Sequence, residues 1–456
     1  MMRSMFSGVS GLRAHQTKID VISNNIANVN TVAFKSARVT FQEVFNQTLK
    51  GSSAPDSNTG RGGTNPMQIG LSTAIGAIDN IMARGSVQRT DNPTDLSIDG
   101  EGFFIVRAGT VDSPKFTRAG NFTIDRQGNL VTSNGLLVQG WQDFNYNTIN
   151  GEYTFDTEKP TVGLNIYQDD TNGNKRIISA TATSNVILAG NLNALSALDT
   201  DTVTAGNQPE VFNVPVTMYD NLGNDYTANI QMYKDDTYTA INRVWHWKID
   251  SPINKMIDGV NQQIATAAGE GTITFGADGK YSAQTVTTAL TITPNTNLAL
   301  GPVTGAVAFS PILDFLKVTQ FSMDSSVAPS EIDGYPTGQL VSFNIGSDGV
   351  ITGIYSNGKQ KPLGMVGLAF FENPAGLKKE GENLFSTTTN SGNYDKGVKP
   401  GTPGIGALSP GTLEMSNVDL SREFTEMITT ERGFQASSKI ITTSDEMLQD
   451  LVNLKR

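Results

Sequence analysis

The stretch SNVDLSREFTEMITTERGFQASSKIITTSDEMLQDLVNLKR, residues 416–456, carries a regular apolar pattern. Apolar side chains recur at an interval of seven residues in one row, and a second row lies beside it. The first row is Leu420, Met427, Phe434, Ile441 and Leu448, with Leu451 next to it, and the second is Ile440, Met447 and Leu454. A sustained interval of seven keeps one apolar seam of a helix facing a partner helix. The pattern therefore predicts a long, coiled-coil-like C-terminal helix.

We expect this helix to begin at Ser416, because Ser416 and Asp419 have the spacing of a capping box. Pro410 and Gly411 mark a break just before it. The one interruption in the helix is Gly433, which should cost about 1 kcal/mol relative to alanine.

A matching pattern lies at the other end of the chain. The residues Met5, Leu12, Ile19 and Ile26 are again seven apart, and Ile22 and Val29 follow three residues after the last two. We expect a helix from Met5 to about residues 28–30. The pattern predicts that the two terminal helices share a seam, although helices packed on a central globular core remain the alternative.

Composition excludes several classes of function. The 456 residues contain no cysteine, which excludes disulfides, thiol chemistry and cysteine-bound metals. A net charge of -11 argues against nucleic-acid binding. We predict no membrane insertion and no cleaved signal peptide, because no apolar run is long enough. The two histidines, His15 and His246, are expected to be packing or surface residues.

The middle of the chain is rich in short alternating apolar runs between Gly, Asn and Asp turns, which predicts β-hairpins. One hairpin is expected around the turn at 220–225 and another over 340–355, whereas the apolar pattern of 39–49 fits either a helix or a strand. The predicted fold class is multidomain and mainly β, with two or more β-rich outer domains inserted between the terminal helices. We expect an inner core domain formed by an N-terminal helix at 1–30 and a C-terminal helix at 406–456. Between them we expect a linker or extended region at 31–69, a discontinuous β-rich middle domain at 70–145 and 334–405, and a β-rich outer domain at 146–333 that is one or two subdomains. Gly- and Pro-rich stretches at 50–66 and 386–411 are expected to be loose connections.

The sequence predicts no catalytic, cofactor or metal site, and hence no enzyme. The run from Asp170 to Asn174 begins like a calcium loop, but Lys175 and Thr181 stand where such a loop needs Gly and Glu. A polar hairpin tip explains this run better.

Both ends of the chain resemble the bacterial flagellar axial family of rod, hook and hook-associated proteins. The N-terminal match is SGLRA at 10–14 with IDVISNNIANVNT at 19–31, and the C-terminal match is SNVDL at 416–420 with ERGFQA at 431–436. Internal segments resemble the hook branch of that family: DGEGFF at 99–104, FTRAGNF at 116–122, GW at 140–141, GNLN at 190–193 and YDNLG at 219–223. Ala33 stands where the family usually has glycine, which argues against a positive φ there. Glu431 replaces a usual Gln.

The resemblance implies a structural subunit that polymerises with copies of itself into a tubular, flexible universal joint, which transmits motor torque from rod to filament. It implies rod, hook-cap and hook–filament junction proteins as partners, and export without a cleaved signal through the flagellar type III apparatus to an extracellular hook. The assembly contacts would lie on the seam residues of both helices, and the linkers would let the β domains tilt. The alternatives are a distal rod or hook-associated junction protein and, from another class, a secreted β-rich carbohydrate-binding protein.

Overall fold

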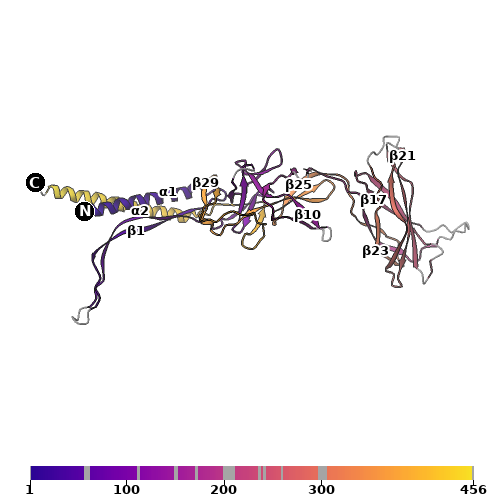
Figure 1. Cartoon of the computed structure of the whole chain (residues 1–456), viewed down its shortest axis with the longest axis horizontal. Coiled ribbons are helices and arrows are strands. Elements are labelled where there is room, and N and C mark those ends of the chain that lie inside the picture. Colours follow the sequence, from indigo (N-terminus) through magenta and orange to yellow (C-terminus); the bar gives the residue numbers. More distant parts are fainter. Residues whose placement is uncertain are drawn as a thin grey trace. The chain divides into compact units, whose positions relative to one another are not determined.

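The chain forms two compact units in the computed structural model, which describes residues 2–55, 62–109, 113–147, 152–169, 173–198, 211–234, 238–239, 243–257, 260–295 and 306–453. Unit 1 comprises 1–174, 343–353 and 361–456, and unit 2 comprises 175–342 and 354–360. The fold is mainly β with one long helix at each end of the chain, as the sequence predicted (Figure 1).

The two helices of unit 1 are α1 (Met2–Ala27) and α2 (Leu420–Asn453), and they lie side by side and antiparallel (Figure 1). The predicted start of the C-terminal helix at Ser416 is wrong. Asp419 is the N-cap, because its Oδ1 accepts hydrogen bonds from the amides of Ser421 at 2.9 Å and Arg422 at 3.3 Å. The residues before it are occupied elsewhere, since Asn417 binds three backbone groups of other segments.

A long two-stranded hairpin begins in the segment 31–69, for which a linker or extended region was expected. Strand β1 (Ala37–Lys50) pairs antiparallel with β2 (Met67–Asn80) over its whole length. Four register irregularities interrupt the ladder, as β-bulges do. The β-branched and aromatic residues of 39–49, whose pattern fitted either a helix or a strand, favour the strand because their partners in β2 complete the ladder.

The rest of unit 1 is a β domain whose central sheet runs in the order β27-β9-β5-β6-β30-β29. Its strands are β3 (Val87–Arg89), β4 (Leu96–Asp99), β5 (Phe103–Arg107), β6 (Lys115–Thr117), β7 (Thr123–Ile124), β8 (Leu130–Val131), β9 (Leu137–Trp141), β10 (Phe144–Asn147), β11 (Glu152–Phe155), β12 (Val162–Gly163), β13 (Gln168–Asp169), β14 (Gly173–Asn174), β27 (Gln360–Val366), β28 (Leu368–Ala369), β29 (Lys378–Gly381), β30 (Leu384–Ser386), β31 (Ala407–Pro410) and β32 (Thr412–Glu414).

The core of this domain is built on edge-to-face phenylalanines. The ring centroids of Phe103 and Phe371 are 5.8 Å apart, and those of Phe116 and Phe371 are 4.8 Å apart. The expected loose connection at 386–411 is also wrong, because Ser391, Ile405 and Leu408 of this segment are buried. Strand β31 within it pairs with β4.

Unit 2 contains two sheets around one apolar core. The larger runs β17-β18-β19-β21-β20 with β22 on β21, and the smaller runs β23-β16-β24. The strands are β15 (Ile177–Ile178), β16 (Asn185–Asn193), β17 (Phe212–Tyr219), β18 (Asp225–Tyr233), β19 (Arg243–Ile249), β20 (Ile253–Ile257), β21 (Val260–Phe275), β22 (Tyr281–Pro294), β23 (Ile312–Phe321) and β24 (Ala328–Ile332). Strands β25 (Gly338–Ile345) and β26 (Val350–Tyr355) contribute to both units.

The hairpin predicted around residues 220–225 is confirmed as β17 and β18. All six alternating apolar residues point into the core: Val214, Val216, Met218, Ala228, Ile230 and Met232. The side chain of Asp220 closes the turn, because its Oδ1 accepts hydrogen bonds from the amides of Leu222 and Asn224 at 2.9 Å each. The hairpin predicted over 340–355 is likewise confirmed as β25 and β26.

Ala33 has φ +57°, so the doubt about a positive φ at this position is not upheld. Its amide donates to the carbonyl oxygen of Glu414 at 2.8 Å, and its methyl group is buried. The tertiary contacts hold a conformation that costs a non-glycine residue roughly 1 kcal/mol or more.

We predict that Gly120→Ala destabilises unit 1. A Cβ at this position would lie 1.7 Å from the carbonyl oxygen of Leu96, so the backbone must move. The expected loss is at least about 2 kcal/mol in the free energy of unfolding, measured by hydrogen exchange of β4 and β5. Gly62→Ala is the matched control, because nothing lies within 4 Å of that position. Equal protection in the two variants would contradict the prediction.

Candidate functional site

The helix pair is held by small residues that let the two backbones approach. A Cβ on Gly8 would lie 3.3 Å from the carbonyl oxygen of Ser437, and one on Gly11 would lie 3.1 Å from the Ser437 hydroxyl oxygen. Ala14 is buried on the same face of α1. Such close approach is a recognised use of glycine inside a helix. The contacts fix an antiparallel register in which the start of α1 meets the second half of α2.

Gly433 is part of this interface and not a flaw in the helix. A Cβ at this position would lie 2.8 Å from Cε1 and 2.9 Å from Nε2 of His15. The His15 ring also makes an edge-on contact with Phe41 of β1, with ring centroids 5.5 Å apart. The glycine therefore gives up some helix propensity to admit an imidazole between α1 and α2.

The predicted seam residues that the structure describes lie on α1 and α2, except Val29, which follows the end of α1, and the helix pair covers them only in part. Ile22 is buried, whereas nine are half-buried: Met5, Leu12, Ile19, Ile26, Val29, Met427, Phe434, Ile441 and Leu448. Leu420 is exposed, and the side chain of Leu451 and all of Leu454 lie outside the described residues. Their role in assembly therefore stays a prediction.

Further apolar side chains are exposed on both helices and on the hairpin. On the helices these are Phe6, Val9, Phe424, Ile428, Ile440, Met447 and Val452. On the hairpin they are Phe41, Val44, Phe45, Leu49, Met67, Ile69 and Ile78. We call the two sets, together with the seam residues, the assembly region. Clustered exposed apolar side chains are typical of a surface that another protein covers.

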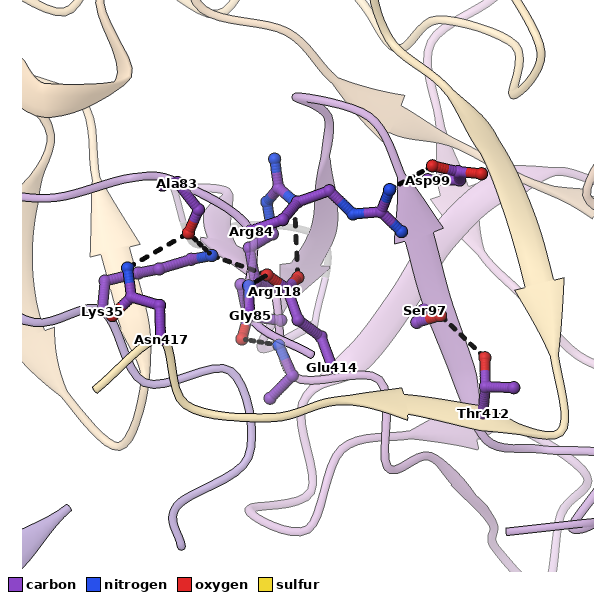
Figure 2. Close-up of polar contacts among 12 residues, drawn as sticks. Lys35, Ala83, Arg84, Gly85, Ser97, Asp99, Arg118, Thr412, Glu414 and Asn417 are labelled. Atoms are coloured by element: carbon purple, nitrogen blue, oxygen red, sulfur yellow. Dashed lines mark hydrogen bonds and ion pairs between the residues drawn. The ribbon is translucent and has the colours of Figure 1, made fainter. Parts of the chain in front are cut away.

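A buried ionic cluster lies where the segments flanking both helices meet the β domain (Figure 2). Glu414, at the end of β32, contacts Lys35 Nζ at 2.6 Å and Arg118 at 3.3 Å. All three side chains are at most 3% exposed. The amide of Gly85 donates to Glu414 at 3.0 Å, and Lys35 Nζ also donates to the carbonyl oxygen of Ala83 at 2.9 Å.

The electrostatics of the cluster follow from its burial. Burial alone would raise the pKa of the Glu414 carboxyl, but Lys35, Arg118 and the Gly85 amide outweigh this and hold the pKa below its ordinary value. Burial lowers the pKa of the Lys35 ammonium and of the Arg118 guanidinium, and Glu414 opposes both shifts. Glu414 therefore offsets the cost of burying the two cations, and they in turn keep its carboxyl ionised.

Asparagines extend this cluster to the helices. Asn417 accepts a hydrogen bond from the amide of Ser36 at 2.8 Å and donates to the carbonyl oxygens of Ile81 and Ala83. Asn25, near the end of α1, makes a two-way pair with the backbone of Ala37 and donates to Glu423 of α2 at 3.2 Å.

The segment after α1 is also fastened to the β domain. Lys379 donates to the carbonyl oxygen of Lys35 at 2.7 Å, and Asn383 donates to that of Val32 at 3.0 Å. The segment 31–37 is therefore packed on the β domain of unit 1, and the predicted tilting of the β domains stays a prediction. Sequence reasoning missed this junction because isolated Lys, Asn and Glu residues carry no periodic signal.

Nothing in the described part of the chain points to catalysis or metal binding. No group of three or more His, Cys, Asp or Glu side chains that could hold a metal ion occurs among the described residues. Residues 170–172 of the weak calcium-loop match lie outside them. Among the helices described, none combines the length and hydropathy of a membrane span.

Family models match four parts of the chain. Residues 5–35 match the flagella basal body rod protein model, and 97–176 match the D1 domain of flagellar hook proteins FlgE/F/G. Residues 191–335 match the D2 domain of the flagellar basal body protein FlaE, and 409–454 match the C-terminal model of the basal body rod proteins FlgEFG.

Three curated relatives align with the chain from end to end. The flagellar hook protein FlgE of Borreliella burgdorferi is 38% identical, and that of Treponema pallidum is 36% identical. The flagellar basal-body rod protein FlgG of Bacillus subtilis is 31% identical. Each alignment covers 100% of this chain and 100% of the relative.

The helix register predicts a specific cross-link. In a chain that lacks cysteine, Gly11→Cys with Ser437→Cys should form a disulfide on mild oxidation, because the two Cβ positions are 3.8 Å apart. Gel mobility after proteolysis would detect it. Gly11→Cys with Ser438→Cys is the control, since the next residue points about 100° away around the helix. Equal yields from the two pairs would refute the antiparallel register.

Glu414→Gln should lower the free energy of opening of the junction by about 3 to 5 kcal/mol, because it leaves Lys35 and Arg118 buried without their counter-charge. Hydrogen exchange of β32 and of the start of β1 would measure the loss. The matched control is Glu158→Gln, which removes an exposed partner of Lys396 and should leave exchange unchanged.

Lowering the pH should reduce the difference in the stability of the junction between the wild type and Glu414→Gln. The pKa of Glu414 is lower in the folded state, so its contribution is complete above the unfolded value of about 4.3 and is lost as the pH falls below that value. A difference that stays constant from about pH 6 to about pH 3 would contradict this assignment.

Proposed function

The chain belongs to the bacterial flagellar hook and rod protein family and is a structural subunit of the flagellar hook, and we propose that it self-assembles into a tube through its assembly region. The observation that carries this proposal is the exposure of apolar side chains along both terminal helices and the hairpin of one chain. Copies of the same chain would cover these surfaces.

The proposal gives the partly covered seam a physical role. Most of the predicted contact residues on α1 and α2 are half-buried in the pair, and they would become fully buried between neighbouring subunits. Burial of apolar surface would then offset the entropy lost on ordering the ends of the chain. A contact between two different surfaces that does not close into a ring generates an open helical tube.

The hairpin supports the same proposal. A two-stranded hairpin is marginally stable by itself and leaves two unpaired edges. Here one part of it rests on α1, where the amide of Thr73 donates to the Ser10 hydroxyl at 3.4 Å. The exposed Phe45, Leu49 and Met67 lie toward its tip and would need cover from a neighbour.

For torque transmission, we propose a stiff connection within each subunit. The buried cluster at Glu414 ties the helix pair to the β domain of unit 1, so torque would pass through it without slack. Bending of a universal joint would then come from sliding between subunits. The proposal includes the predicted middle domain at 70–145 and 334–405 and the predicted outer domain at 146–333.

The proposed partners are the rod, the hook cap and the hook–filament junction proteins, and the proposed route is flagellar type III export without a cleaved signal. The absence of cysteine suits a chain that is threaded unfolded, because no disulfide can close it beforehand. We propose no catalytic activity and no cofactor.

The sequence left two alternatives to the hook function, and they differ in how well the observations support them. A rod or junction role is the nearer one, since a relative named as a basal-body rod protein aligns over the full chain. A carbohydrate-binding role needs exposed aromatic rings, whereas all three tryptophans, Trp141, Trp245 and Trp247, are at most 2% exposed.

We predict that Phe434→Asp blocks polymerisation while unit 2 stays folded. A charge on the seam has no partner after burial, and a penalty above about 1.4 kcal/mol raises the critical concentration more than about tenfold. Electron microscopy after addition of a precipitant would count tubes, and hydrogen exchange of unit 2 would report folding. Leu222→Asp, at an exposed turn of unit 2, is the control and should still form tubes. Normal tubes from Phe434→Asp would overturn the proposal.

A further inference from the structure

His15 occupies a position in unit 1 that the proposed assembly does not yet explain. Its ring lies against Gly433 of α2, and a Cβ added to Gly433 would be only 2.8 Å from Cε1 of the ring. It also lies edge-on to Phe41 of β1, with planes inclined at 77°. One side chain of α1 therefore touches both α2 and strand β1 of the hairpin.

The imidazole has the surroundings of a neutral ring. Its Nδ1 is buried and has no hydrogen-bond partner among the described residues. A neutral imidazole can leave Nδ1 as an unprotonated acceptor, whereas the charged form makes both nitrogens donors that require acceptors. Charging the ring would bury an N–H group without a partner.

Among the charged groups on the elements around the ring, Lys18 disfavours a cation. On α1, Lys18 lies close to the ring and lowers its proton affinity. On α2, Glu426 contacts Lys18 at 3.4 Å, while Glu431 and Arg432 beside Gly433 are exposed. On the hairpin, Glu43 binds Asn46 and Asp79 pairs with Arg38.

We propose that His15 is the positioning residue of the assembly region: its neutral ring, seated between Gly433 and Phe41, sets the register of α1 on α2 and holds the hairpin against them, and protonation releases both. The inference rests on the proposed self-assembly, because it names the residue that regulates the same surface. It makes tube stability dependent on pH through one side chain.

The direction of the pH effect follows from linkage. Burial, followed by Lys18, lowers the pKa of His15 below its ordinary value of 6.5. The packed state therefore binds the proton less well than the released state, and packing is most stable above about pH 6.5. It weakens as the pH falls from that value toward the lowered pKa. Tubes should be stable at about pH 7.5 and dissociate at about pH 5.

The test uses the full chain and its two histidines. Tubes of the wild type, His15→Gln and His246→Gln are formed at about pH 7.5, moved to about pH 5 and sedimented. His246 is the matched control, because its ring stacks on Tyr233 in unit 2, with centroids 5.7 Å apart. We expect the pelleted fraction of the wild type and of His246→Gln to fall at least about threefold, and that of His15→Gln to stay constant.

A second measurement tests the packing without acid. Gly433→Ala should reduce the yield of the disulfide between cysteines placed at Gly11 and Ser437, because the new methyl group collides with the ring. Adding His15→Ala should restore the yield, since it removes the group that collides.

These outcomes separate the inference from the function on which it rests. If wild-type tubes form but His15→Gln shows the same pH profile, or if His15→Ala fails to restore the disulfide, the role of His15 is refuted and the hook assignment stands. If the wild type forms no tubes, both proposals fail.

Discussion

Glu414 is the charge on which the architecture of unit 1 depends. Its carboxylate joins the segment before α2 to Lys35 after α1, to Arg118 of the β domain and to the Gly85 amide after β2. Burying three charges costs several kcal/mol each, and their attraction repays this only when every polar atom has good partners. Such a cluster contributes more to the choice of one packing arrangement than to net stability, because any other packing would leave a buried charge without its partner. It makes the ends of the chain and the β domain assemble in one arrangement.

The helix pair depends on close backbone contact and not on buried charges, since glycines stand at its contact positions. Gly8, Gly11 and Gly433 remove the Cβ atoms that would separate the helices, and the His15 ring takes the space at Gly433. Each glycine costs about 1 kcal/mol in helix propensity. The sequence gives up local stability for a close contact that forms only in the pair, so isolated helices should be weaker than their apolar pattern implies. Order at the chain ends is thereby linked to packing.

A subunit of this kind exposes on its surface the groups that a monomer would bury. The seam is half covered, and the hairpin presents Phe45 and Met67 to solvent. The two β regions differ, because their cores are complete within a single chain. In unit 1 the core phenylalanines Phe103, Phe116, Phe371 and Phe385 are buried, and in unit 2 Trp245 and Trp247 are buried. Folding of the β regions therefore needs no partner, whereas covering of the ends does. β regions that fold within one chain and ends that need a neighbour suit a subunit that is added one copy at a time and becomes fully stable in the assembly.

The sequence by itself determined the two terminal helices, the mainly β middle and the hairpins at 212–233 and 338–355, because periodicity and turn residues are local signals. It placed the start of α2 at Ser416, three residues before the N-cap Asp419. It also left residues 39–49 open between helix and strand and took the packed segment 386–411 for a loose connection, since strand pairing and burial depend on residues far away. Only the tertiary structure decided that Gly433 admits His15, that Ala33 keeps a positive φ and that Lys35, Arg118 and Glu414 meet. Lys35 and Glu414 are 379 positions apart, and no local pattern encodes a contact at that separation.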